Sequence, residues 1–207
     1  MSMTVDINQW LVSTTTDMKT TRAYTMTTRA QGAEATRRRI VDSAISLVGE
    51  LPFGEITLDV VAERAAVSVK TVLRHFGSRD GLFADAMDAA MVETENERRT
   101  SPGDIEAALR SLVEHYERRG RTALLMLAQE GYDDVARTVT TRGKAMHRDW
   151  VREAFAPHSD DEALLDLLVV ATDVYTWKLL RLDRGHSRAV TERRMHDLVQ
   201  ALLSKEH

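Results

Sequence analysis

The hydrophobic residues of the chain recur with the spacing of amphipathic helices from residue 35 onward. In the first such segment they fall at i, i+4, i+7, i+8 and i+11, which places one face of a helix on Ile40, Ala44, Leu47, Val48 and Leu51. Pro52 and Gly54 end this helix. The same pattern returns in later segments, and none alternates convincingly as a strand would. The sequence therefore predicts an all-α fold of about nine helices.

The N-terminal residues 1–33 lack this periodicity. They are rich in Thr, with charged residues scattered between, and we expect them to form a flexible arm. Met26 lies shortly before the first helix, so translation could start at either of two methionines. Either residues 1–25 belong to the native protein, or translation begins at Met26.

Two short helices follow the first one and are separated by a brief turn. Thr57 is a favourable N-cap for one of them and Ser68 for the other, and Gly77 is a suitable C-terminal stop. A short helix, a turn and a second short helix are a helix-turn-helix, whose second helix enters the DNA major groove. Ser78 then caps a fourth helix, which ends at a breaker over residues 100–103.

Longer helices are expected in the remaining chain. Asp104 caps one helix, and Gly120 separates this helix from the apolar run 123–128. A long helix follows that run and stops before Pro157. Residues 159–162 form a capping box for a helix over about 160–183. Its apolar residues cover nearly all sides, so we expect burial on most of its surface. A last helix spans about 188–204.

The second helix of the helix-turn-helix carries the candidate DNA contacts. On a helical wheel its face opposite the core presents Lys70 and Arg74, which can reach phosphates and base edges. We expect Lys70 and Arg74 to read bases, and Thr57, Thr71 and Arg79 to contact phosphates. The full set of candidate DNA-binding residues is Thr57, Ser68, Lys70, Thr71, Leu73, Arg74, His75 and Arg79.

Charge and composition narrow the function classes. The net charge is −4, yet residues 35–80 carry seven Lys/Arg against six Asp/Glu, whereas residues 81–207 carry 18 against 23. The absence of Cys excludes disulfides and thiolate chemistry. No apolar run is long enough for a membrane span and no secretory signal is evident, so we expect a cytoplasmic protein that does not enter a membrane.

Enzymatic motifs are not found in the sequence. It has no Gly-rich phosphate loop, no nucleophile elbow and no His-Glu-x-x-His pair, and its seven histidines lack metal-ligand spacing. We therefore expect no catalytic residues, no metal and no cofactor. A helical enzyme stays open only as a minor alternative.

The segments Thr57–Ser68, Thr71–Phe76 and Ser78–Phe83 resemble the DNA-binding domain of the tetracycline-repressor (TetR) family in order, spacing and residue type. The resemblance covers about residues 35–83, and the remainder is similar only in architecture. It implies a ligand-responsive transcriptional regulator, usually a repressor, that binds double-stranded DNA. The domains would then be the arm 1–33, a helix-turn-helix domain 34–81 and a ligand-binding and dimerisation domain 82–207.

Three residues depart from the family pattern. Ala66 stands where the turn usually has Gly, and a backbone with positive φ there would cost energy. Leu73 replaces a Tyr that usually contacts phosphate, and Arg79 replaces a Lys. Leu73 leaves a second interpretation open, which is a helical adaptor of the same fold that does not bind DNA.

The second domain is expected to dimerise and to hold an effector. The apolar helix over 160–183 and the last helix can pair with their copies in a four-helix bundle, which predicts a homodimer and a palindromic operator. A larger monomeric core is the alternative. The effector would be an apolar or amphipathic small molecule of unknown identity. The candidate pocket residues are Met126, Gln129, Tyr132, His147, Trp150, Asp173, Thr176 and Trp177.

Overall fold

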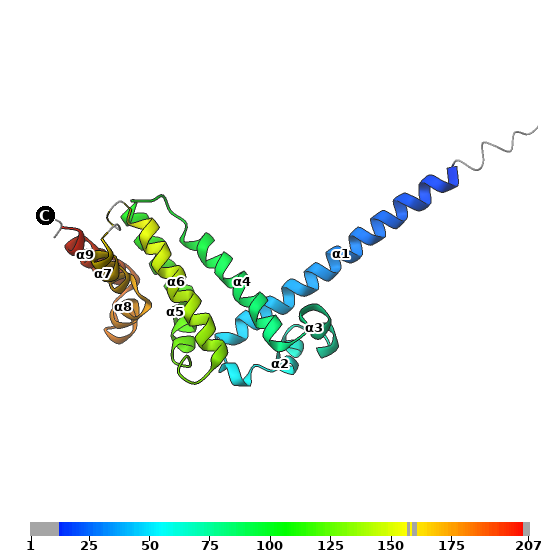
Figure 1. The fold of residues 1–207 in the computed structure, drawn as a ribbon, viewed down its shortest axis with the longest axis horizontal. Coiled ribbons are helices and arrows are strands. Elements are labelled where there is room, and N and C mark those ends of the chain that lie inside the picture. The colour runs from blue at the N-terminus through cyan, green and yellow to red at the C-terminus, as the bar shows by residue number, and fades with distance from the viewer. Residues whose placement is uncertain (1–12, 157, 159–160, 205–207) are drawn as a thin grey trace, which may run out of the picture.

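The computed structural model describes residues 13–156, 158 and 161–204, and every regular element within them is helical (Figure 1). This confirms the expected all-α fold for the part of the chain that is described. The helices at the two ends of the fold are separated by α4, α5 and α6. Helices α2 and α3 lie at one end, beside α1, and α7, α8 and α9 lie at the other.

Helix α1 (Ser13–Val48) begins well upstream of the expected start near residue 35. The arm expected over residues 1–33 is thus corrected for residues 13–33, whose backbone continues α1, while residues 1–12 lie outside the described residues. The N-terminal half of α1 extends away from the other helices (Figure 1). Residues 30–35 are all exposed, so this part of the helix has no packed face that an apolar pattern could reveal.

The predicted caps organise the next helices. After the short 3-10 turn η2 (Phe53–Glu55), helix α2 spans Leu58–Arg64, α3 spans Val69–Phe76 and α4 spans Arg79–Arg98. The hydroxyls of Thr57, Ser68 and Ser78 each accept the backbone N–H three residues later. The helix-turn-helix therefore forms from local capping signals, as the sequence predicts.

A first apolar core holds these helices together. Its buried members come from α1, α2, α3 and the start of α4, with Ile40, Val61 and Val72 almost fully excluded from solvent. Phe53 packs edge-on against Phe83, with ring centroids 5.5 Å apart. Ala136, near the start of α6, is also buried in this core. The first core is thus continuous with helices of the C-terminal half.

Helix α5 (Ile105–Leu127) runs through Gly120 without a break, so the expected separation at this glycine is wrong. Gly120 lies against the indole of Trp177, and a Cβ at this position would come within 2.6 Å of the ring. The glycine therefore serves the close approach of α8 to α5 rather than the end of a helix.

The C-terminal helices are α6 (Asp134–Ala154), α7 (Glu162–Thr172), α8 (Val174–Lys178) and α9 (Arg188–Leu203), with a π-helical turn η4 (Leu179–Asp183) before α9. The single helix expected over 160–183 is broken at Asp173, which caps α8 by accepting the N–H of Tyr175. Asp161 caps α7, while Ser159 and Asp160 of the expected capping box lie outside the described residues. A second apolar core joins these helices to α5.

Candidate DNA-binding surface and effector cavity

Helix α3 turns one face into the first core and the other to solvent. Val72 is fully buried and Phe76 is half-buried, whereas Lys70 and Arg74 are exposed and Leu73 keeps 41% of its surface. This is the orientation that the helical wheel predicts. The outward face therefore presents two cations and one apolar side chain.

Lys70 and Arg74 have no carboxylate partner within the part of the chain that the structure describes. Neighbouring cations are already paired: Arg64 meets Glu50 at 2.7 Å, and Arg37 forms an ion pair with Asp85. Charges without a partner are the ones available to phosphates and base edges, because no internal bond must first be broken. The base-reading role of both residues stays a prediction.

The three candidate hydroxyl residues lie at the starts of α2 and α3. Thr57 Oγ1 accepts the N–H of Val60 at 3.3 Å, and Ser68 Oγ accepts that of Thr71 at 3.2 Å. The hydroxyls of Ser68 and Thr71 are 3.0 Å apart. Thr57 and Ser68 are exposed, so the free helix N-termini and these hydroxyls are accessible to a phosphate, as expected for DNA contact.

Arg79 and His75 are more enclosed than the other candidates. The Arg79 Nε donates to the Ile56 carbonyl at 2.9 Å, its Nη2 donates to the Phe53 carbonyl, and its guanidinium lies 4.7 Å from the Phe83 ring centroid. Arg79 therefore ties α4 to the η2 turn. His75 is half-buried, and its Nε2 has no hydrogen-bond partner among the described residues. Phosphate contact by Arg79 stays a prediction.

A cavity of about 380 Å³ lies where the two cores meet. Helices α1, α4, α5 and α6 and the junction of α7 with α8 contribute to its wall. Three of the candidate pocket residues line it: Met126, His147 and Asp173. Trp150 instead borders an adjoining cavity of about 640 Å³ between α4 and α6, which shares Met91, Thr94, Arg98 and Met146 with the first.

The other four candidates do not line either cavity. Tyr132 is 75% exposed, and the Thr176 hydroxyl donates to the Val170 carbonyl. Trp177 is buried against α5 and donates through Nε1 to Glu117 at 3.1 Å. The side chain of Gln129 accepts the N–H of Phe53 at 3.0 Å, so it links the C-terminal half to the η2 turn. These four residues therefore bond or pack within the protein, or face solvent, and do not line a cavity.

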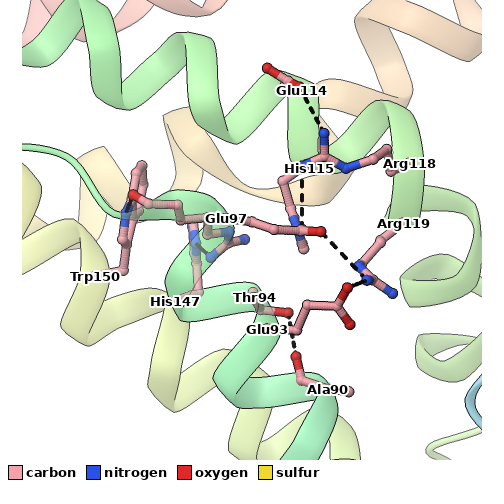
Figure 2. A network of polar contacts seen from close by, with 11 residues as sticks. Ala90, Glu93, Thr94, Glu97, Glu114, His115, Arg118, Arg119, His147 and Trp150 are labelled. Atoms are coloured by element: carbon pink, nitrogen blue, oxygen red, sulfur yellow. Dashed lines mark hydrogen bonds and ion pairs between the residues drawn. The ribbon is translucent and has the colours of Figure 1, made fainter. Parts of the chain in front are cut away.

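A network of charges at one end of the cavity was missed by the sequence interpretation. Figure 2 shows His115, whose Nδ1 is 2.7 Å from Glu97 Oε2, and Arg119, which meets Glu93 at 2.7 Å. Arg118 pairs with Glu114 at 2.7 Å. Arg98 lies in the same region and is only 4% exposed. The sequence did contain a pattern that predicts the inward position of Arg98. The inward face of α4 continues in steps of four residues from Ala90 to Thr94 and Arg98.

Both cavity histidines are held neutral. Burial and the positive charge of Arg98 lower the pKa of His147 to about 3, and the same two causes lower that of His115 to about 4. Neutral His147 accepts from Arg98 Nη1 through Nδ1 at 3.4 Å, so its Nε2 donates to the Thr172 hydroxyl at 3.1 Å. The Thr172 hydroxyl in turn donates a hydrogen bond to the Leu168 carbonyl at 2.7 Å. The tautomer of His147 follows from these partners.

Within the single chain, the apolar segment expected as one helix over 160–183 leaves one face exposed, and its burial against a second subunit stays a prediction. Leu167 and Val170 of α7 are 50% and 64% exposed, and Tyr175, Leu179 and Leu198 are also about half exposed. We call these five residues the apolar face. No described helix combines the length and apolar character needed to span a membrane. Among the described residues, no group of three or more His, Asp or Glu is placed to hold a metal ion.

Comparison with known proteins agrees with this geometry. The family model of bacterial regulatory proteins of the tetR family matches residues 40–86, which span the helix-turn-helix and its flanking helices. No curated protein matches the chain. Residues 40–86 therefore form a DNA-binding domain of the kind found in bacterial regulatory proteins of the tetR family.

Solved structures share the fold over most of the chain. A transcriptional regulator from Rhodococcus sp. RHA1 aligns with a TM-score of 0.63 at 16% identity, covering 81% of this chain and 96% of that one. A TetR transcriptional regulator from the same organism aligns with a TM-score of 0.54 at 20% identity, covering 84% and 99%. A TetR-like regulator from this organism gives 0.55 at 17% identity, covering 83% and 97%. These identities establish the fold alone.

Proposed function

We propose that this protein is a transcriptional regulator of the TetR family, a ligand-responsive repressor that acts in the cytoplasm as a homodimer and leaves a palindromic operator when a small molecule binds. One observation carries the proposal: the 380 Å³ cavity touches both halves of the molecule. Its wall includes Ile45 of α1 and Phe83 of α4 from the first core, together with Tyr116 of α5 from the second. A ligand in this cavity contacts both halves, so its affinity can depend on how they are placed.

Two polar links connect the cavity region to the helix-turn-helix. Gln129, just after α5, accepts the N–H of Phe53, and Arg79, at the start of α4, donates to the carbonyls of Phe53 and Ile56. Both helices line the cavity, so a shift of either is passed to the turn that precedes α2. This gives a physical route by which an effector changes the placement of α3.

The apolar face supports the homodimer. Its five exposed residues lie on α7, α8, η4 and α9, which pack against one another, and a group of exposed apolar residues is typical of an association surface, whereas scattered single residues need no partner. We expect Val170→Asp to make the protein monomeric at micromolar concentration, as measured by size-exclusion chromatography with light scattering. Val92→Asp is the matched control, since Val92 is 58% exposed on α4, outside this face. A wild-type monomer would contradict the homodimer.

Base reading by Arg74 tests the DNA-binding part of the proposal. We expect Arg74→Ala to cost about 1–3 kcal/mol of binding free energy on the operator and much less on a scrambled duplex. Fluorescence anisotropy with DNA from upstream of the gene measures both. Arg193→Ala is the control, because Arg193 is exposed on α9.

Two results would count against this proposal. Equal losses on both duplexes would assign Arg74 to phosphate contact and move base reading to Lys70 or Leu73. Failure of the wild-type protein to bind any upstream duplex would favour the adaptor interpretation.

A further inference from the structure

Arg98 differs from the other cations of the cavity wall in having no carboxylate within ion-pair distance, among the residues that the structure describes. Its side chain is 4% exposed, and its Nε is buried with no hydrogen-bond partner in the described part of the chain. Nη1 has a weak partner, the Nδ1 of His147 at 3.4 Å. Burial of a guanidinium with so few acceptors costs desolvation free energy, which an additional anionic partner would offset.

The remaining cations of the wall are neutralised by their own partners. Each of them meets a carboxylate at 2.7 Å, and these pairs are Arg118 with Glu114, Arg119 with Glu93, and Lys144 with Glu130. Glu97 is shared by His115, Arg118 and Arg119. None of these carboxylates lies within ion-pair distance of Arg98, although Glu97 and Asp173 act on its charge from farther away.

The groups around Arg98 stabilise its charge without neutralising it. Its Cζ lies 5.6 Å from the Tyr116 ring centroid and 5.4 Å from that of Trp150, and such cation–π contacts are favourable but supply no negative charge. Asp173 also lines the cavity, but its carboxylate accepts the N–H of Tyr175 at 2.8 Å and lies beyond ion-pair distance of Arg98. The guanidinium is thus positioned for an anionic acceptor that the described residues do not supply.

We propose that the cavity takes an amphipathic organic acid, with its carboxylate on Arg98 and its apolar body against side chains such as Met87 and Met91. This inference rests on the proposed function, because it names the chemical class of the effector. An inorganic anion would leave the apolar part of the cavity empty. A neutral ligand would leave the guanidinium unpaired.

Matched pairs of acid and amide test the charge. Octanoate, decanoate and naphthoate are each compared with their primary amides by titration calorimetry on the full-length protein. We expect an acid that fits to bind roughly tenfold to 100-fold more tightly than its amide. Arg98→Met should abolish this preference, and Arg98→Lys should keep part of it. Arg99→Met, on the exposed neighbouring residue, should leave the preference unchanged.

A second measurement needs no ligand. Thr94 lines the cavity one helical turn before Arg98, so a carboxylate introduced there can act as an internal acceptor. We expect Thr94→Glu to have a higher thermal midpoint than Thr94→Gln. In the Arg98→Met background this order should reverse, because the introduced charge would then be buried without a partner.

The outcomes separate this inference from the proposed function. Equal binding of acids and amides overturns the inference, and release of DNA by either class would still support a ligand-responsive regulator. Preferred binding of an acid that leaves operator affinity unchanged supports the acid site and contradicts the ligand response. If no acid binds, a higher midpoint for Thr94→Glu supports an acid with a different apolar body. If that difference is also absent, the inference is overturned.

Discussion

Ala66→Gly is expected to stabilise the protein, because Ala66 has a left-handed backbone with φ of 52°. The residue follows the C-cap of α2 in the turn of the helix-turn-helix. Its N–H donates to the Glu63 carbonyl at 3.1 Å, and the Val67 N–H donates to the Ala62 carbonyl at 2.9 Å. These two bonds define a Schellman turn, whose left-handed position favours glycine because a Cβ is crowded there.

The magnitude follows from two opposing terms. The left-handed conformation costs a residue with a Cβ roughly 1–2 kcal/mol. Glycine gives back about 0.4–1 kcal/mol through the larger conformational freedom of its unfolded chain. The Ala66 side chain is exposed, so no packing is lost. The net gain in unfolding free energy is about 0.5–1 kcal/mol, which raises Tm by about 1–4 °C for a chain of this size.

Thermal and denaturant unfolding followed by circular dichroism measures this gain. The expected order of stability at position 66 is Gly, Asn, Ala and Val, because Asn tolerates positive φ and β-branched residues do not. Ala84→Gly is the control: Ala84 is exposed inside α4, where glycine should cost about 1 kcal/mol. If Ala66→Gly lowers stability as much as Ala84→Gly does, the reasoning from backbone strain is refuted.

Two further predictions concern the second core. Gly120→Ala should destabilise the protein by about 1–3 kcal/mol despite the better helix propensity of alanine, because the new Cβ would lie 2.6 Å from the Trp177 ring. Urea unfolding measures this effect, and Gly143→Ala, in open space on α6, should be mildly stabilising. His147→Gln should flatten the pH dependence of stability. The pKa of His147 is about 3 in the folded protein against an ordinary value of 6.5, so the unfolded state binds the proton first as pH falls below 6.5. Native stability should then fall by up to about 1.4 kcal/mol per pH unit through this residue alone.

Matched variants decide these two predictions. Gly120→Ala that unfolds at the wild-type midpoint would mean that α5 and α8 are farther apart than described. For the pH effect, urea midpoints are compared between pH 7.5 and 5, with His196→Gln of α9 as the control. An unchanged slope in His147→Gln would show that His147 is not buried in the neutral form. Part of the wild-type slope should persist, because the pKa of His115 is also lowered.

The helix-turn-helix could be predicted from the sequence because its signals are local. A capping hydroxyl bonds to an N–H only three residues away, as Thr57, Ser68 and Ser78 do, and Gly77 ends α3 with a φ of +75°. The apolar spacing of α3 also fixes which side chains face outward, so Lys70 and Arg74 could be assigned from the helical wheel alone. The sequence likewise identified Ala66 as the residue for which positive φ would be costly.

Tertiary contacts decided where several helices begin and end, and which residues meet at the cavity. Gly120 resembles a helix end in sequence, but packing against Trp177 keeps it inside α5, and Asp173 interrupts an apolar run that would otherwise predict one long helix. Residues 30–35 of α1 are exposed and form no apolar stripe, so periodicity could not reveal that the helix continues through them. Local sequence determined the caps and the outward face of α3, because those depend on neighbours within one helical turn. Only tertiary structure could bring Arg98, Tyr116 and His147 together from three helices, because their proximity depends on packing between segments far apart in the chain.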